Sequence, residues 1–179
     1  YNNLGVTLKD LDQLEEAVKC YEKALIIKPD YPEAHNNLGN ALKNLGRLSK
    51  AVECFERMLT IDPDNAEGHN NLGITLYDLG QPNAACKSYM NALAIEPEYA
   101  EAHSNLGITL NELGRFEAAE ASYNRALAIA PHFAEAYSNQ GDLLTDLKRL
   151  DEALVSYETA FNLKPDIIFM LGKLLHTKM

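Results

Sequence analysis

The chain has 179 residues, of which 46% are apolar, so it is long enough for one ordinary domain or a short repeat array with a sizeable core. Its formal net charge of −10 argues against binding to nucleic acid or to an anionic membrane, because both require a basic face. No apolar run approaches the ~18 residues that a membrane span needs, and three cysteines without a close pair indicate a reducing, cytoplasmic setting.

A period of 34 residues runs through the sequence. It separates five glycines: Gly5, Gly39, Gly73, Gly107 and Gly141. It also separates five alanines, each followed four residues later by an aromatic residue: Ala17, Ala51, Ala85, Ala119 and Ala153. Prolines recur at the same step: Pro29, Pro63, Pro97, Pro131 and Pro165. These columns share one register, which predicts an array of tandem repeats.

Each repeat predicts two helices, except that the first repeat lacks the start of its first helix. In the second repeat they span residues 33 to 45 and about 49 to 62. The later pairs are expected at 67 to 79 with 83 to 95, 101 to 113 with 117 to 130, and 135 to 147 with 151 to 164. Beyond residue 167 the pattern breaks, and an apolar segment predicts a further helix that caps the stack.

The repeated residues suggest how the helices pack. Gly39 costs about 1 kcal/mol in a helix relative to alanine, which is reasonable if a neighbouring helix approaches its backbone. Ala51 and Phe55 lie on one face of the second helix, a small residue beside a large one. Two residues depart from their columns: Pro82 replaces a leucine or phenylalanine and Met58 replaces an alanine, and we interpret both as local repacking.

A 34-residue unit with Leu-Gly, then Ala-x-x-x-aromatic, then Pro resembles the tetratricopeptide repeat (TPR) over essentially the whole chain. The resemblance implies an all-α fold, an α-solenoid of stacked helix-turn-helix units in a right-handed superhelix. We expect five units, the first truncated at its start, followed by a C-terminal capping helix: 1–31, 32–65, 66–99, 100–133, 134–166 and 167–179.

An asparagine recurs on the outward side of every first helix, and in three repeats it stands in the words HNNLG or HSNLG. We call this set the asparagine column: Asn3, Asn37, Asn71, Asn105 and Asn139. In the TPR family the first helices line a concave groove, so the resemblance places the column on its floor. An amide can pair with both the C=O and the N–H of an extended peptide. Helices ~8–10 Å apart and a rise of ~3.3 Å per residue would then set one rung about every third peptide residue; alternatively, the asparagines are solvated scaffold residues.

Acidic and apolar residues share this outward side. The glutamate column would attract Lys or Arg of a ligand, or is only a solvated helix face: Glu33, Glu67, Glu101 and Glu135. Ile74 and Ile108 are candidate seats for a ligand side chain, and Asn40 lies on the same side. We therefore expect protein or peptide ligands that are extended and neutral or basic.

Neither a catalytic motif nor a metal site is predicted. His35, His69 and His103 repeat, but equivalent positions on stacked units should lie ~10 Å apart, too far for one metal ion. The same spacing disfavours a disulfide between Cys20 and Cys54. There is no phosphate-binding loop or nucleophile elbow, so we expect a non-catalytic segment without cofactors.

The asparagine column, the phrases YAEAHSNLG and FAEAYSNQG, and LKPD followed by LGKLLHTKM resemble the TPR region of O-linked N-acetylglucosamine transferases and their bacterial, SPINDLY-type relatives. That resemblance implies a region that presents protein substrates to a glycosyltransferase domain of a longer protein. Two alternatives stay open: a stand-alone adaptor for a multiprotein complex, and a homo-oligomer formed through the apolar segment 167 to 175. Binding at micromolar affinity or weaker is expected, because each net hydrogen bond contributes only ~1 kcal/mol.

Overall fold

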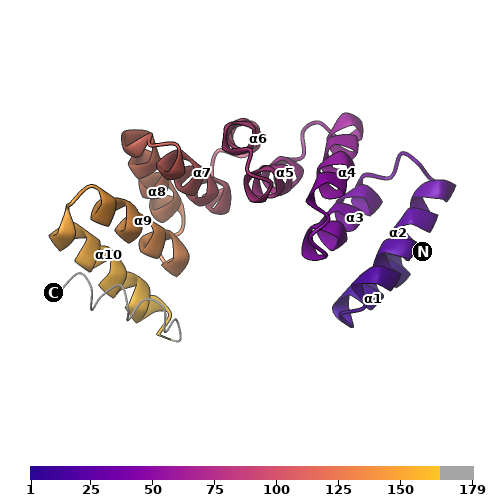
Figure 1. Cartoon of the computed structure of the whole chain (residues 1–179), viewed down its shortest axis with the longest axis horizontal. Helices are drawn as coiled ribbons and strands as arrows, with labels where there is room; N and C mark the ends of the chain where they lie inside the picture. The colour runs from indigo at the N-terminus through magenta and orange to yellow at the C-terminus, as the bar shows by residue number, and fades with distance from the viewer. Residues whose placement is uncertain (166–179) are drawn as a thin grey trace. The chain divides into compact units, whose positions relative to one another are not determined.

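The computed structural model describes residues 1–165, and all regular structure in this range is helical. Successive helices pair into hairpins (Figure 1). In chain order the helices are α1 (Asn2–Asp10), α2 (Leu14–Ile27), α3 (Pro32–Asn44), α4 (Leu48–Ile61), α5 (Ala66–Asp78), α6 (Pro82–Ile95), α7 (Ala100–Glu112), α8 (Phe116–Ile129), α9 (Ala134–Asp146) and α10 (Leu150–Leu163). The expected all-α class with stacked helical hairpins is confirmed. The predicted capping helix at 167–179 lies outside the described residues, and no helix within 1–165 has the length and apolar character needed to cross a membrane.

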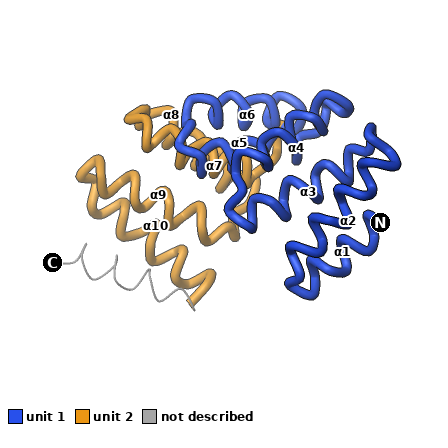
Figure 2. The backbone as a smooth tube through the Cα atoms, turned by 45° about the vertical axis from the view of Figure 1, so that its right-hand side comes forward, with its two compact units in different colours: residues 1–96 blue, residues 97–179 orange. Residues whose placement is uncertain are grey.

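The chain divides into two compact units, one of residues 1–96 and one that begins at Pro97 (Figure 2). In the first unit α2 packs between α1 and α3, α4 packs between α3 and α5, and α6 packs on α5. The first helices also touch, α1 with α3 and α3 with α5. In the second unit α8 packs between α7 and α9, α10 packs on α9, and α7 touches α9. Within each unit, the exposed side of these first helices is the first-helix face.

The recurring glycines let an aromatic ring of the partner helix approach the backbone. A Cβ atom at Gly39 would lie 2.8 Å from the Phe55 ring, and one at Gly5 would lie 2.5 Å from the Tyr21 ring. Both rings are fully buried. The close approach expected at Gly39 is therefore present, and a methyl group there would displace the ring.

Glycine also recurs in the turn between the two helices of a repeat, a position that we did not predict from the sequence. Gly46, Gly80 and Gly114 have φ of +72°, +75° and +68°. Asp12 and Lys148 occupy the equivalent turns with φ of +58° and +61°. Because a side chain in this region crowds the following carbonyl oxygen, these two residues carry backbone strain that the glycines avoid.

The two departures from the repeat pattern have different explanations. Pro82 is the first residue of α6, one residue before the start predicted from sequence, because proline's fixed φ and missing N–H suit that position. Met58 is 2% exposed, and its methyl group lies where a Cβ atom at Gly68 would be. Gly68 itself stands in a column that holds alanine in the other repeats: Ala34, Ala102 and Ala136. The large residue at 58 and the missing side chain at 68 are thus a compensating pair.

Candidate functional site

The asparagine column lies on the first helices, as predicted. Asn3, Asn37 and Asn71 lie on α1, α3 and α5 of the first unit, and Asn105 and Asn139 lie on α7 and α9 of the second. Asn3 is exposed and the other four are half-buried. The amides are therefore reachable from solvent within each unit.

We call the amides of the asparagine column the ladder amides, and two of them in the first unit also bond to the preceding repeat. Asn37 Nδ2 donates to Asn2 Oδ1 at 3.1 Å, and Asn71 Nδ2 donates to Asn36 Oδ1 at 3.2 Å. The doubled asparagine of the sequence is thus explained: the first of the pair accepts from the second of the next repeat. One N–H of Asn37 and of Asn71 is used in this way. The Oδ1 atom and the other N–H of each have no side-chain partner among residues 1–165.

The glutamate column lies in the first turn of each helix, at α3, α5, α7 and α9. A carboxylate there stabilises the helix through its dipole, which is a structural reason for the column. Glu33 accepts from Asn2 Nδ2 at 2.8 Å and from the Tyr31 hydroxyl at 3.3 Å. Lys164 Nζ lies 2.6 Å from Glu135 Oε1, and its hydrogen bond lowers the pKa of that carboxyl group.

The apolar positions lie one helical turn beyond the ladder. Ile74 and Ile108 are half-buried on α5 and α7, and Asn40 is half-buried at the equivalent place on α3. In the last described repeat this place is taken by Asp142, which accepts a hydrogen bond from the Tyr157 hydroxyl at 2.8 Å. A ligand side chain would therefore meet an isoleucine on α5 and α7 but a polar residue on α3 and α9.

Two hollows at repeat-equivalent places open beside the ladder in the first unit, and the sequence analysis did not anticipate them. The Lys28 hollow, of about 310 Å³, is lined among others by Tyr1, Asn2, Ile27, Lys28 and Tyr31. The Asp62 hollow, of about 300 Å³, is lined among others by Pro32, Glu33, Asn36, Met58, Asp62 and Glu67. Each hollow is lined by the first asparagine of the doubled pair, Asn2 in one and Asn36 in the other. Their charges are opposite, because Lys28 of the first hollow corresponds to Asp62 of the second. Only three-dimensional packing closes these hollows, because the first combines α1, α2 and the turn before α3, and the second combines α3, α4 and α5.

The repeated histidines hold the turns that precede the first helices. The Nε2 atoms of His35, His69 and His103 lie 2.8, 3.1 and 3.0 Å from the carbonyl oxygens of Pro29, Pro63 and Pro97. Since a carbonyl only accepts, Nε2 carries the proton and donates. Each histidine therefore has a structural role, and residues 1–165 contain no group of three potential metal ligands.

The cysteines are free thiols. Burial raises the pKa of Cys54 to about 11, with smaller contributions from the charges of Glu53 and Glu22. The Cys54 thiol is therefore protonated at neutral pH, and the thiolate that would act as a nucleophile is scarce.

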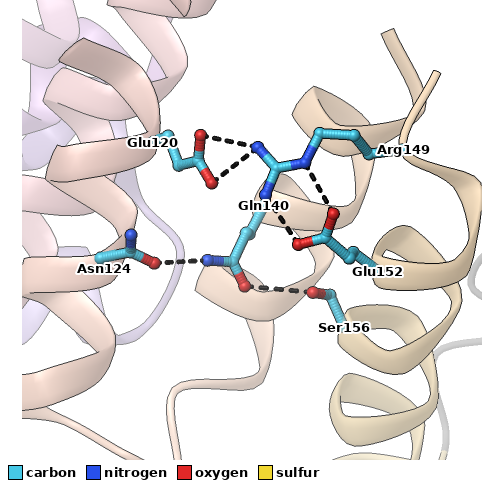
Figure 3. A network of polar contacts seen from close by, with 6 residues as sticks. All are labelled: Glu120, Asn124, Gln140, Arg149, Glu152 and Ser156. Atoms are coloured by element: carbon cyan, nitrogen blue, oxygen red, sulfur yellow. Dashed lines mark hydrogen bonds and ion pairs between the residues drawn. The ribbon is translucent and has the colours of Figure 1, made fainter. Parts of the chain in front are cut away.

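A polar cluster joins three helices of the second unit (Figure 3). Gln140 of α9 stands in a column of leucines, yet its amide donates to Asn124 of α8 at 2.8 Å and accepts from Ser156 of α10 at 3.1 Å. Arg149 reaches both oxygens of Glu120 at 2.9 and 2.8 Å, and it also pairs with Glu152. These bonds fasten the last described hairpin to α8, so the cluster has a structural function.

Comparison with known proteins identifies repeats of one kind. A model described as "TPR repeat" matches residues 5–46, and models described as "Tetratricopeptide repeat" match residues 32–65, 64–132 and 134–167. A search of curated protein sequences gave no match.

Solved structures share the fold along nearly the whole chain. PilW, a widely conserved type IV pilus biogenesis factor, is 26% identical with a TM-score of 0.88, and the match covers 98% of this chain and 83% of that one. TTC0263, a thermophilic TPR protein of Thermus thermophilus, is 28% identical with a TM-score of 0.78, covering 98% and 96%. YrrB, described as a TPR protein with an unusual peptide-binding site, is 25% identical with a TM-score of 0.77, covering 97% and 89%.

Proposed function

The chain belongs to the tetratricopeptide repeat family, and on that premise we propose that it binds extended segments of partner proteins along its first-helix face, through the asparagine column. The segment's main chain is the part recognised, so many sequences are accepted. YrrB, a relative of the same fold, is described as having a peptide-binding site.

The observation that carries this proposal is the state of the ladder amides. In Asn37 and Asn71 one N–H is held by the preceding repeat, at 3.1 and 3.2 Å. This bond fixes the orientation of the amide and leaves an acceptor and a donor for a ligand. An amide fixed in advance loses less entropy on binding than a free one. The pair of free groups matches the C=O and N–H of an extended chain.

The test compares two double variants of the full chain. Asn37→Ala with Asn71→Ala removes the ladder amides together with the bonds between repeats. Asn2→Ala with Asn36→Ala removes the same bonds but keeps the ladder amides. Binding of 12-residue Ser/Thr-containing peptides is measured by fluorescence anisotropy, and folding is checked by circular dichroism.

We expect the first variant to bind at least about tenfold more weakly, because each of the two amides loses two hydrogen bonds to the peptide and each bond contributes up to ~1 kcal/mol. The second variant should keep most of its binding while losing stability. Equal losses in both variants would mean that the asparagines act only through the fold, and the ladder would be rejected.

A more specific role is that of the substrate-recognition region of a protein O-glycosyltransferase, which rests on the sequence resemblance stated above. It predicts that the longer protein transfers a sugar to Ser or Thr of segments bound on this face. Mass spectrometry of modified Ser/Thr residues in cells that express it tests this role, and no ladder-dependent modification would reject it.

The stand-alone adaptor is the second candidate, favoured by the type IV pilus biogenesis factor among its structural relatives. An adaptor would assemble its complex without attached enzymatic activity. Self-association is the third candidate, and light scattering across concentrations tests it. A cytoplasmic location is part of all three candidates.

A further inference from the structure

We propose that the Asp62 hollow binds a lysine or arginine side chain of the segment held on the first-helix face. The inference rests on the proposed function, because it adds a side-chain preference to a face that otherwise recognises the main chain. It concerns only the first unit, where α3, α4 and α5 together form the hollow.

The Asp62 hollow carries negative charge that no cationic side chain of its lining compensates. Glu33, Asp62 and Glu67 line the hollow and no cationic side chain does. The donors that reach these carboxylates are neutral: Asn2 and Tyr31 for Glu33, and Asn65 for Asp62, the last at 2.9 Å. An entering ammonium or guanidinium group would form charge-assisted hydrogen bonds here that no group of the described chain forms.

The carboxylate of Asp62 also stands at an unfavourable place on its helix. Asp62 is the C-cap of α4, where the helix dipole is negative and a carboxylate is unfavourable. Glu33 and Glu67, by contrast, lie in the first turns of α3 and α5 and offset the positive dipole ends there. The charge of Asp62 is therefore in surplus. The column is mixed in character: Lys28, Asp62, Glu96, Ala130 and Lys164.

The shape of the hollow suits a long side chain with a charged end. Pro32 supplies apolar surface for the methylene groups, and the hollow is also lined by Met58, which is itself only 2% exposed. The volume of about 300 Å³ is at the lower end for ligand pockets, which suits one side chain rather than a whole small molecule.

The Lys28 hollow predicts which residue the bound segment prefers one repeat away from its lysine or arginine. It lies one repeat earlier, and Lys28 stands where the other hollow has Asp62, with its Nζ atom 4.9 Å from the centroid of the Tyr31 ring. A second cation would be repelled there. Neighbouring repeats ~10 Å apart correspond to about three residues of an extended chain. The preferred segment thus has Lys or Arg at one position and an apolar or acidic residue three positions away, in one of the two directions.

The experiment uses the full chain and a positional-scanning set of 12-residue fluorescent peptides made of Ser, Thr, Ala, Gln and Leu. One Lys, Gln or Glu is moved through the positions. We expect Lys to bind about fivefold more tightly than Gln at one position in 50 mM salt, with a smaller ratio in 0.5 M salt. Glu67→Lys should reverse the preference toward Glu. Asp62→Asn should abolish it while raising the thermal midpoint, because it removes a carboxylate from a helix C-terminus.

Glu56→Lys is the matched control, since it makes the same change in charge on an exposed part of α4 outside the hollow. It should keep the preference for Lys. If peptides bind but Lys and Gln bind equally at every position, or if Glu56→Lys reverses the preference as Glu67→Lys does, the hollow is not a cation site although peptide binding stands. If no peptide binds, both this inference and the proposed function are overturned.

Discussion

The large side chain of Met58 fits because residue 68 is a glycine. A Cβ atom at Gly68 would lie 2.0 Å from the methyl carbon of Met58, so Gly68→Ala forces the buried thioether to move. We expect a net loss of about 1 kcal/mol, since overpacking costs about 1–3 kcal/mol and the better helix propensity of alanine returns part of it. In a Met58→Ala background the same substitution should be stabilising, because the pair then matches the alanine pairs of the other repeats. Urea denaturation of the four proteins tests this, and the same sign in both backgrounds would contradict it.

Lys148 carries strain that the sequence alone does not reveal. Its φ is +61°, in a turn where three other repeats have glycine. Lys148→Gly should raise stability by about 0.5–1 kcal/mol, because the left-handed conformation costs a side chain about 1–2 kcal/mol and glycine's greater freedom when unfolded takes part of this back. Gly114→Ala in the preceding turn is the opposite control and should be destabilising. Thermal denaturation that shows no gain for Lys148→Gly would mean that the backbone relaxes without cost.

At the scale of elements, the last described hairpin depends on ion pairs as well as on packing. Arg149 joins Glu120 of α8 to Glu152 of α10, and its hydrogen bond lowers the pKa of Glu152. A carboxyl group whose pKa is lowered by folding stabilises the folded state at pH values above its unfolded-state pKa. That stabilisation is lost as the pH falls through the folded-state pKa. Arg149→Ala should therefore speed hydrogen exchange in α9 and α10 at neutral pH and low salt, with a smaller effect in 0.5 M salt or at acid pH.

Arg125→Ala is the control for this prediction. Arg125 belongs to the same unit and approaches Glu98 only to 3.7 Å, so its removal should change exchange in α9 and α10 little. If both substitutions act alike, or if the effect of Arg149→Ala is independent of salt, the ion pairs do not fasten the hairpin.

Helices were the most predictable level of this molecule. The repeat period predicts the helix bounds to within one residue: α3, for example, spans Pro32–Asn44 rather than 33–45. The position of Gly39 opposite Phe55 likewise follows from the sequence pattern. The doubled asparagine is visible in the sequence, but the hydrogen bond between Asn37 and Asn2 depends on the distance between two repeats. Sequence periodicity does not contain that distance. For the same reason the hollows beside Lys28 and Asp62 could not be predicted.

At the scale of the whole molecule, both units present a first-helix face that carries carboxylates and amides. We propose that the net charge of −10 favours neutral or basic partners over nucleic acid. The asparagine column is uncharged and would recognise the main chain of a peptide rather than its side chains. Affinity should therefore vary little among neutral peptides. Selectivity would then come from the Lys28 and Asp62 hollows beside the ladder amides of the first unit.

The most direct measurement is a titration of the ¹⁵N-labelled chain with a 12-residue peptide, following the side-chain amide signals of asparagine by NMR. We expect the signals of Asn37 and Asn71 to shift together, while those of Asn83 and Asn91, both exposed on α6, stay in place. Shifts confined to α6, or no shift of Asn37 and Asn71 when the peptide is bound, would contradict the claim that the asparagine column holds the ligand.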